Sequence, residues 1–178
     1  MKKDVNVLET IGRGLVAGLA GTIAITASTM IEARLRGRPE STTPSKVGGK
    51  VLGVRPRNRA GQKRFNNIVH WDYGMSWGLF LALAEDLGLT GLPASVAHFS
   101  AVWGTALVML PAADASKPVT EWEPQDIAID VMHHAVYAAV AGLVYELLAP
   151  KEERAEEPED ERPEGTYRFP KHLLASEL

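Results

Sequence analysis

Residues 14–31 read GLVAGLAGTIAITASTMI, eighteen positions in a row without a charged side chain. As an α-helix this stretch would be about 27 Å long, which is enough to cross the hydrocarbon core of a bilayer. A helix on the surface of a soluble protein carries a charged face, and this stretch has none. We therefore predict a membrane-spanning helix over about residues 13–32.

Three more apolar segments follow along the chain and predict spans over about residues 65–85, 92–112 and 126–148. Glycines and prolines separate these segments, and no sustained alternation of apolar and polar residues predicts a strand. The expected fold class is all-α, a four-transmembrane-helix bundle at residues 1–149 with a basic loop at residues 33–64. An acidic, partly disordered C-terminal tail is expected at residues 150–178.

A soluble helical bundle with one long basic loop is the competing interpretation. Asp72 and Asp130 each interrupt an apolar segment, and an aspartate in the middle of a span costs about 2.5–3.5 kcal/mol on insertion scales. A helix over residues 14–31 would carry no charge on any face, which favours the membrane interpretation.

Charge is distributed unevenly along the 178 residues, whose formal net charge is −3. Residues 33–64 contain ten Lys and Arg and a single acid, whereas residues 151–178 contain nine acids and five bases. Because positively charged loops stay in the cytoplasm, we expect an inner-membrane protein with this loop cytoplasmic and both termini on the opposite side. The absence of cysteine excludes a disulfide scaffold, thiol catalysis and Cys-ligated metal.

The basic loop predicts contact with anionic lipid, because each basic residue near a membrane surface contributes about 1 kcal/mol. Nucleic-acid binding is not expected, since residues 33–64 contain no aromatic side chain. The segment TPSKVGGKVL at residues 43–52 is compatible with a short interfacial helix, although its two glycines weaken it. The candidate lipid-binding residues are Arg55, Arg57, Arg59, Lys63 and Arg64.

A cluster of ionisable residues is predicted inside the bundle, from His70, Asp130, His133 and His134. The last three fall within an arc of about 100° on the fourth predicted helix. Counted at 1.5 Å per residue, these four residues lie roughly 6–11 Å below the cytoplasmic surface, whereas His98 lies roughly 21 Å below it. A hydrogen-bonded clasp is the favoured interpretation, and no cofactor is predicted. A divalent metal site, a bis-His haem b site and a proton relay remain open alternatives.

Small residues recur at four-residue spacing on the first predicted helix, as Gly14/Gly18/Thr22/Thr26 and as Ala20/Ala24/Ser28. Such ridges allow the backbones of two membrane helices to approach closely. We expect them to pack against other helices of the same chain, with homodimerisation as the alternative.

No nucleophile elbow, P-loop, dinucleotide-binding motif or H-E-x-x-H zinc motif occurs in the chain. The stretches NNIVHWDYG (66–74), HFSAVWG (98–104) and DVMHHAVYA (130–138) resemble a group of small uncharacterised bacterial four-helix integral membrane proteins. The resemblance covers about residues 12–148. It implies four helices and a membrane location, and it transfers no catalytic residue because that group has no assigned activity.

An enzymatic activity is therefore not expected. The predicted function is that of a non-catalytic accessory or scaffold subunit of a membrane assembly, in contact with membrane lipid and with other subunits or a second copy of itself. The alternative from a different class is a membrane metal-, haem- or proton-handling protein that uses the His/Asp cluster.

Overall fold

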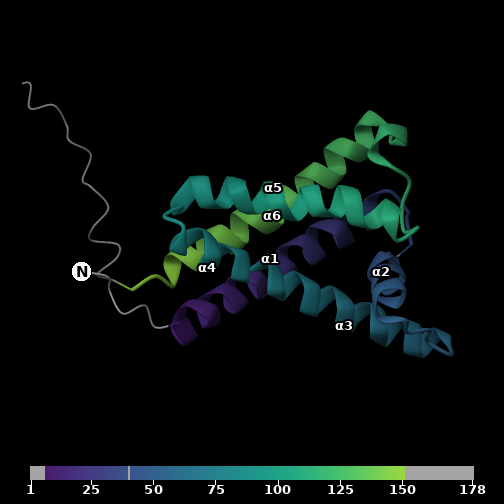
Figure 1. Cartoon of the computed structure of the whole chain (residues 1–178). Coiled ribbons are helices and arrows are strands. Elements are labelled where there is room, and N and C mark those ends of the chain that lie inside the picture. The colour runs from purple at the N-terminus through teal and green to yellow at the C-terminus, as the bar shows by residue number, and fades with distance from the viewer. Residues whose placement is uncertain (1–6, 40, 151–178) are drawn as a thin grey trace, which may run out of the picture. The chain divides into compact units, whose positions relative to one another are not determined.

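Helices make up all the regular structure in the part of the chain that the computed structural model describes, residues 7–39 and 41–150 (Figure 1). Of these residues 80% are helical and none lies in a strand. The prediction of an all-α fold is therefore confirmed. The helices are α1 (Val7–Leu35), α2 (Thr43–Leu52), α3 (Arg59–Trp77), α4 (Leu79–Asp86), α5 (Gly91–Ala112) and α6 (Pro124–Leu147), with a 3₁₀ turn, η1 (Val119–Glu121), before α6.

Three of these helices, α1, α5 and α6, are long enough and apolar enough to cross a membrane. They overlap the spans predicted over residues 13–32, 92–112 and 126–148. Only 22–28% of the residues in their most apolar windows are buried within the protein. Large apolar side chains therefore point outward, and Ile23, Val108 and Leu143 are each more than half exposed. Such a surface indicates a membrane protein, because soluble monomers rarely expose large contiguous apolar patches.

The segment predicted as one span over residues 65–85 consists of two helices. α3 starts earlier, at Arg59, and ends at Trp77, and α4 begins after Gly78. Around this break the hydrogen bonds are of the i→i+3 type. The amide of Gly78 donates to the Met75 carbonyl and the amide of Leu81 donates to the Gly78 carbonyl, each at 3.1 Å.

The break coincides with the closest contact between α1 and the α3–α4 segment. A Cβ atom added to Gly78 would lie 2.0 Å from the carbonyl oxygen of Gly14, and one added to Gly18 would lie 2.3 Å from the carbonyl oxygen of Met75. One turn further along, a Cβ on Gly74 would lie 2.2 Å from Oγ1 of Thr22. At Gly78 and Gly18 backbone touches backbone, and at Gly74 the backbone touches the Thr22 side chain, which only glycine permits. The expectation that the Gly14/Gly18/Thr22/Thr26 ridge packs within the chain is thereby confirmed.

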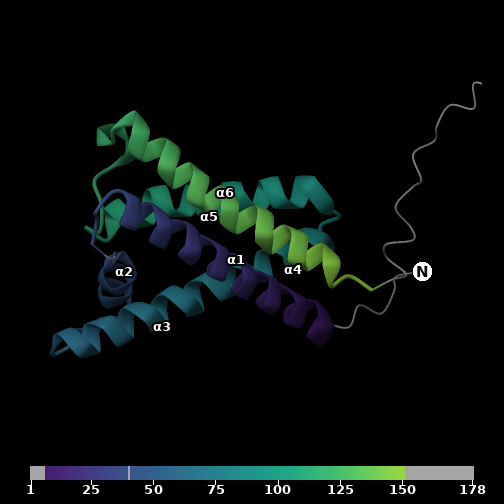
Figure 2. The same ribbon diagram turned by 180° about the vertical axis from the view of Figure 1, so that it is seen from behind.

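The opposite side of α1 packs against α6, so that α1 lies between α3 and α6 (Figures 1 and 2). A Cβ on Gly21 would lie 2.8 Å from the ring of Tyr137, and Ala17 and Ala141 are completely buried. The buried core consists largely of alanines and contains few large side chains. Close approach of helix backbones, rather than a large apolar interior, therefore holds the bundle together.

The basic loop predicted at residues 33–64 is largely helical, because it contains α2 and the first turns of α3. α2 packs on α3 at Gly48, where an added Cβ would lie 2.7 Å from a methyl carbon of Val69. The side-chain oxygen of Asn66 accepts a hydrogen bond from the backbone amide of Ser45 at 2.9 Å, and Asn58 caps the start of α3. Gly48, one of the two glycines expected to weaken α2, thus allows its contact with α3, whereas an added Cβ on Gly49 would lie 3.0 Å from the carbonyl oxygen of Val54. The acidic tail, from residue 151 onward, lies outside the described residues.

Candidate functional site

His70, the first member of the predicted cluster, lies on the α3 side of α1. Its Nε2 is 2.9 Å from Oγ1 of Thr26. The hydroxyl of Thr26 already donates to the Thr22 carbonyl at 2.6 Å, so His70 must donate its Nε2 proton to Thr26. This hydrogen bond continues the α1–α3 contact beyond the glycines.

His133, the second member, is buried on the α6 side of α1. Its Nδ1 is 2.7 Å from Oγ of Ser28, and its Nε2 is 4.0 Å from a carboxylate oxygen of Glu32. If the Ser28 hydroxyl donates its hydrogen bond to Nδ1, the ring proton lies on Nε2, where it faces the negative carboxylate. His133 thus fixes the position of α6 along α1.

Thr26 and Ser28 are two residues apart and therefore point about 200° apart around α1. Their histidine partners, His70 and His133, consequently lie on opposite sides of that helix. The expectation that His70 meets the histidines of the fourth predicted helix is wrong for this reason. Equal depth along the bundle does not bring two side chains together when a helix separates them.

Asp130 and His134 form a third, separate contact. One carboxylate oxygen of Asp130 accepts a hydrogen bond from Nε1 of Trp103 on α5 at 2.9 Å. Nδ1 of His134 lies 2.9 Å from the backbone oxygen of Asp130 and 3.5 Å from its carboxylate. Within residues 7–39 and 41–150, no three His, Asp or Glu side chains are grouped closely enough to hold a metal ion. The four predicted residues therefore make three helix-to-helix or local contacts and no common site.

His98, on α5, is buried near the break between α3 and α4 and makes its ring contacts with Phe80 and Tyr137. It is fully buried, and its ring lies 5.8 Å from that of Phe80 and 5.4 Å from that of Tyr137, measured between centroids. Neither ring nitrogen has a hydrogen-bond partner among the described residues. The nearby polar group is the backbone of Trp77, the last residue of α3.

Two clusters of charged residues, one at each end of α1, were not identified as clusters from the sequence. At the C-terminal end, Glu32 accepts hydrogen bonds from Arg38 and, at 3.2 Å, from Arg36. Arg36 also donates to Asp126 at the start of α6, at 3.3 Å. The pKa of Arg36 is raised by these hydrogen bonds to Asp126 and Glu32.

At the N-terminal end of α1, Arg13 is buried between α4 and α6. Its guanidinium lies 3.4 Å from a carboxylate oxygen of Glu85 and 4.4 Å from the ring centre of Tyr145. The Tyr145 hydroxyl donates to the same carboxylate group. Nearby, the Glu146 carboxylate accepts a hydrogen bond from the backbone amide of Gly91 at 2.8 Å, which connects the start of α5 to the end of α6. In the sequence Arg13 and Glu85 each border an apolar run, which marks them as flanks of predicted spans but does not pair them.

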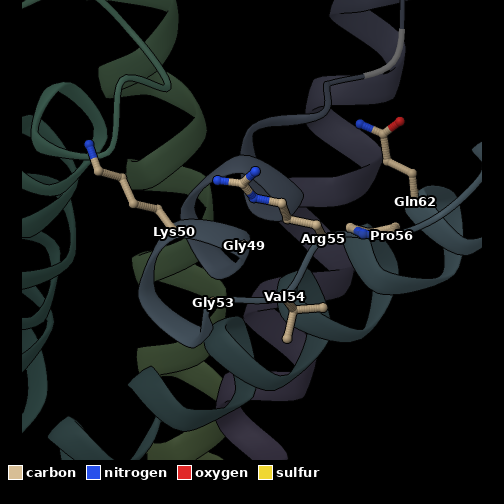
Figure 3. A pocket seen from close by; sticks show the side chains of 7 residues that line it. All are labelled: Gly49, Lys50, Gly53, Val54, Arg55, Pro56 and Gln62. Atoms are coloured by element: carbon tan, nitrogen blue, oxygen red, sulfur yellow. The ribbon is translucent and has the colours of Figure 1, made fainter.

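The predicted lipid-binding residues Arg55, Arg57, Arg59, Lys63 and Arg64 are all exposed. Arg55 is the one that lines a shallow pocket of about 610 Å³ at the end of α2 (Figure 3). The polar ends of Lys50, Arg55 and Gln62 lie on the same side of this pocket in the view of Figure 3. The pocket is lined by Gly49, Lys50, Gly53, Val54, Arg55, Pro56 and Gln62.

Lys50 also connects the pocket to α5. Its ammonium donates to the backbone oxygen of Ala112 at 2.9 Å and to the carboxylate of Asp114. The neighbouring ammonium lowers the pKa of Asp114. Lys50 therefore ties the end of α2, and with it the pocket, to the C-terminal end of α5.

No protein-family model, no curated protein and no solved structure matches the chain. The function is accordingly inferred from the geometry of the described residues alone.

Proposed function

We propose that the protein is an integral membrane protein that crosses the inner membrane four times, and that it serves as a non-catalytic accessory or scaffold subunit of a membrane assembly. In this arrangement α1, α5 and α6 are three of the crossings, and α3 with α4 is the other. The observation that carries the proposal is the spacing of the two charged clusters.

The clusters centred on Arg13 and on Glu32 are nineteen residues apart on α1, or about 28 Å at the rise of an α-helix. Asp126 and Glu146 on α6 are twenty residues apart, about 30 Å. The hydrocarbon core of a bilayer is about 30 Å thick. The charges thus lie where the two membrane surfaces would be, and the outward apolar side chains lie between them.

The scaffold role is supported by how the ionisable side chains inside the bundle are used. Arg13 pairs with Glu85, Asp130 with Trp103, and His133 with Ser28. These contacts join one helix to another instead of converging on a point where a substrate could bind. The metal and haem alternative has less support, because His70 lies across α1 from His133.

For the lipid contact, we propose that the end of α2 lies in the headgroup region of the cytoplasmic leaflet. Val51, Leu52 and Val54 are well exposed beside the basic pocket, and an apolar edge next to basic residues is typical of interfacial segments. Arg55 and Lys50 would then face anionic headgroups, together with the exposed Arg57, Arg59, Lys63 and Arg64.

Single cysteines test the number of crossings, because the chain contains no cysteine of its own. The exposed residues Lys46, Thr90 and Thr120 lie in the three segments between the crossings. With four crossings, cysteines at positions 46 and 120 react with an impermeant maleimide from the cytoplasmic side and a cysteine at 90 reacts from the other side. If α3 and α4 do not cross, positions 46 and 90 share a side, which would contradict the model.

The scaffold role is tested on the purified protein in detergent by absorption spectroscopy and elemental analysis. We expect no haem band and no metal at a stoichiometric level. A Soret band or one bound metal ion per chain would refute the role and favour the alternative. Release of the protein from membranes by carbonate, without detergent, would refute the membrane location itself.

A further inference from the structure

Asp72 is the acidic residue of α3 that the bundle leaves outside. Gly74 faces Thr22 of α1, and Asp72 is two residues earlier, so its side chain points about 200° away from that contact. Asp72 is exposed, and it makes no hydrogen bond or ion pair with any residue of the described ranges. It therefore points away from α1, toward whatever surrounds the bundle.

The depth of Asp72 places it within the proposed hydrocarbon layer. It lies eight residues from Arg64, the last basic residue before the apolar part of α3, and thirteen residues from Glu85, or about 12 Å and 20 Å. The residues on the same outward face are mostly apolar, and Ile68 and Leu83 are more than half exposed. The face consists of Ile68, Asp72, Ser76, Leu79 and Leu83.

The comparison with Asp130 is informative, because the fold treats the two intramembrane aspartates differently. Asp130 accepts a hydrogen bond from Trp103 and lies beside His134, so its charge is accommodated within the bundle. Asp72 has no such neighbour. An aspartate left in lipid costs about 2.5–3.5 kcal/mol near the centre of a span, so a partner that neutralises it gains affinity.

We propose that this outward face of α3 docks a transmembrane helix of a partner protein that carries a lysine or arginine at the depth of Asp72. The proposal rests on the accessory-subunit function above and specifies the chemistry of the partner. Charge complementarity identifies the occupant, since the remainder of the face is apolar except for Ser76, whose hydroxyl donates to the Tyr73 carbonyl within α3, and fits any membrane helix.

A second copy of this chain does not supply the required charge. Residues 14–31, 65–84, 91–112 and 127–144, which make up the segments between the charged clusters, contain no lysine or arginine. A symmetric pair through α3 would instead bring one Asp72 toward another, and like charges in low dielectric repel. The favoured occupant is therefore a different protein.

The test uses the full-length protein in liposomes with synthetic membrane-spanning Leu/Ala peptides. One peptide carries a single lysine at its eighth apolar position, and matched peptides carry norleucine or glutamate there. Energy transfer from a donor on a cysteine at Thr120 to an acceptor on the peptide reports association. Polar contacts in membranes contribute about 0.6–1.7 kcal/mol, so the lysine peptide should bind about three- to eighteenfold more tightly than the norleucine peptide.

Three variants assign the preference to one residue. Asp72→Asn should abolish the preference for lysine, and Asp72→Lys should transfer it to the glutamate peptide. Asp86→Asn, which removes an exposed acid at the end of α4, is the matched control and should keep it. Because Asp72 has no partner in the bundle, its variants should unfold in detergent at the same point as the unsubstituted protein.

Equal binding of the lysine and norleucine peptides, or an unchanged preference in Asp72→Asn, would overturn the proposal. A disulfide between two copies carrying Ser76→Cys would also overturn it, because the face would then be covered by a second copy. These outcomes differ from failure of the proposed function. In that case the protein would not remain in the carbonate-washed liposomes, or the purified protein would show a Soret band or a stoichiometric metal.

Discussion

Replacing Gly18 with alanine tests the close contact between α1 and α3. The added Cβ would lie 2.3 Å from the Met75 carbonyl oxygen and 3.0 Å from the Gly78 nitrogen. Both obstacles are backbone atoms, which cannot rotate away, so the two helices must separate by about 1 Å to reach ordinary van der Waals contact. Insertion of a methyl group into a packed interface costs about 1–3 kcal/mol, offset by up to about 1 kcal/mol of helix propensity.

The matched control is Gly12→Ala on the same helix, where an added Cβ meets nothing within 4 Å. We expect Gly18→Ala to lower the free energy of unfolding by about 1–2 kcal/mol, and Gly12→Ala to leave it unchanged or raise it by up to about 1 kcal/mol. Both are measured by titrating micelles of the refolded protein with SDS and following tryptophan fluorescence. Equal losses in the two variants, or no loss in Gly18→Ala, would refute the argument from backbone contact.

Two further predictions concern the histidine contacts of α1 and the contact of α2 with the end of α5. In a double-mutant cycle on the free energy of unfolding, His133→Ala should couple to Ser28→Ala by about 0.5–1 kcal/mol. His133→Ala should be additive with His70→Ala, because α1 separates the two histidines. Coupling between His70 and His133 would show that α1 does not lie between them. The Lys50–Asp114 pair should stabilise the contact of α2 with the end of α5 at neutral pH, because the pKa of Asp114 is lowered in the fold. This stabilisation is complete above the ordinary aspartate pKa of about 3.9, and it is lost as the pH falls through the lowered pKa. Lys50→Met should raise the pKa of Asp114, read from its carboxyl NMR shift, and remove that part of the acid-induced loss; an unchanged pKa would count against the pair.

The positions of the apolar helices could be predicted from the sequence because α1 and α5 each coincide with a run that lacks charge, and the apolar run of α6 is interrupted only by Asp130. The ridge beginning at Gly14 and Gly18 was likewise visible, since four-residue spacing of small side chains has one common use. The break at Gly78 was not visible. Nothing in the run from residue 65 to residue 85 distinguishes Gly78 from Gly74, and only the approach of α1 makes one of them the end of a helix.

The candidate cluster failed for a related reason. The rise per residue gives the depth of a side chain along the bundle, but it does not say which helix that side chain contacts. His70 and His133 contact different faces of α1. The charged residues Arg13 and Glu32 were treated as flanks of a span because a single sequence cannot pair them with partners that lie far away along the chain. Glu85, the partner of Arg13, is 72 positions distant.

The contact surface that α1 provides for α3 has a consequence for insertion of the protein into the membrane. α1 is long and apolar enough to cross a membrane, whereas α3 carries His70 and Asp72, whose burial in hydrocarbon is costly. In the proposed membrane arrangement, Thr26 offers His70 a hydrogen-bonding partner, and the glycines of α1 offer the backbone of α3 a surface it can approach closely. In that arrangement α1, which is synthesised before α3, would already lie in the membrane when α3 leaves the ribosome. The N-terminal helix would then act as an internal insertion chaperone for the more polar helix that follows it.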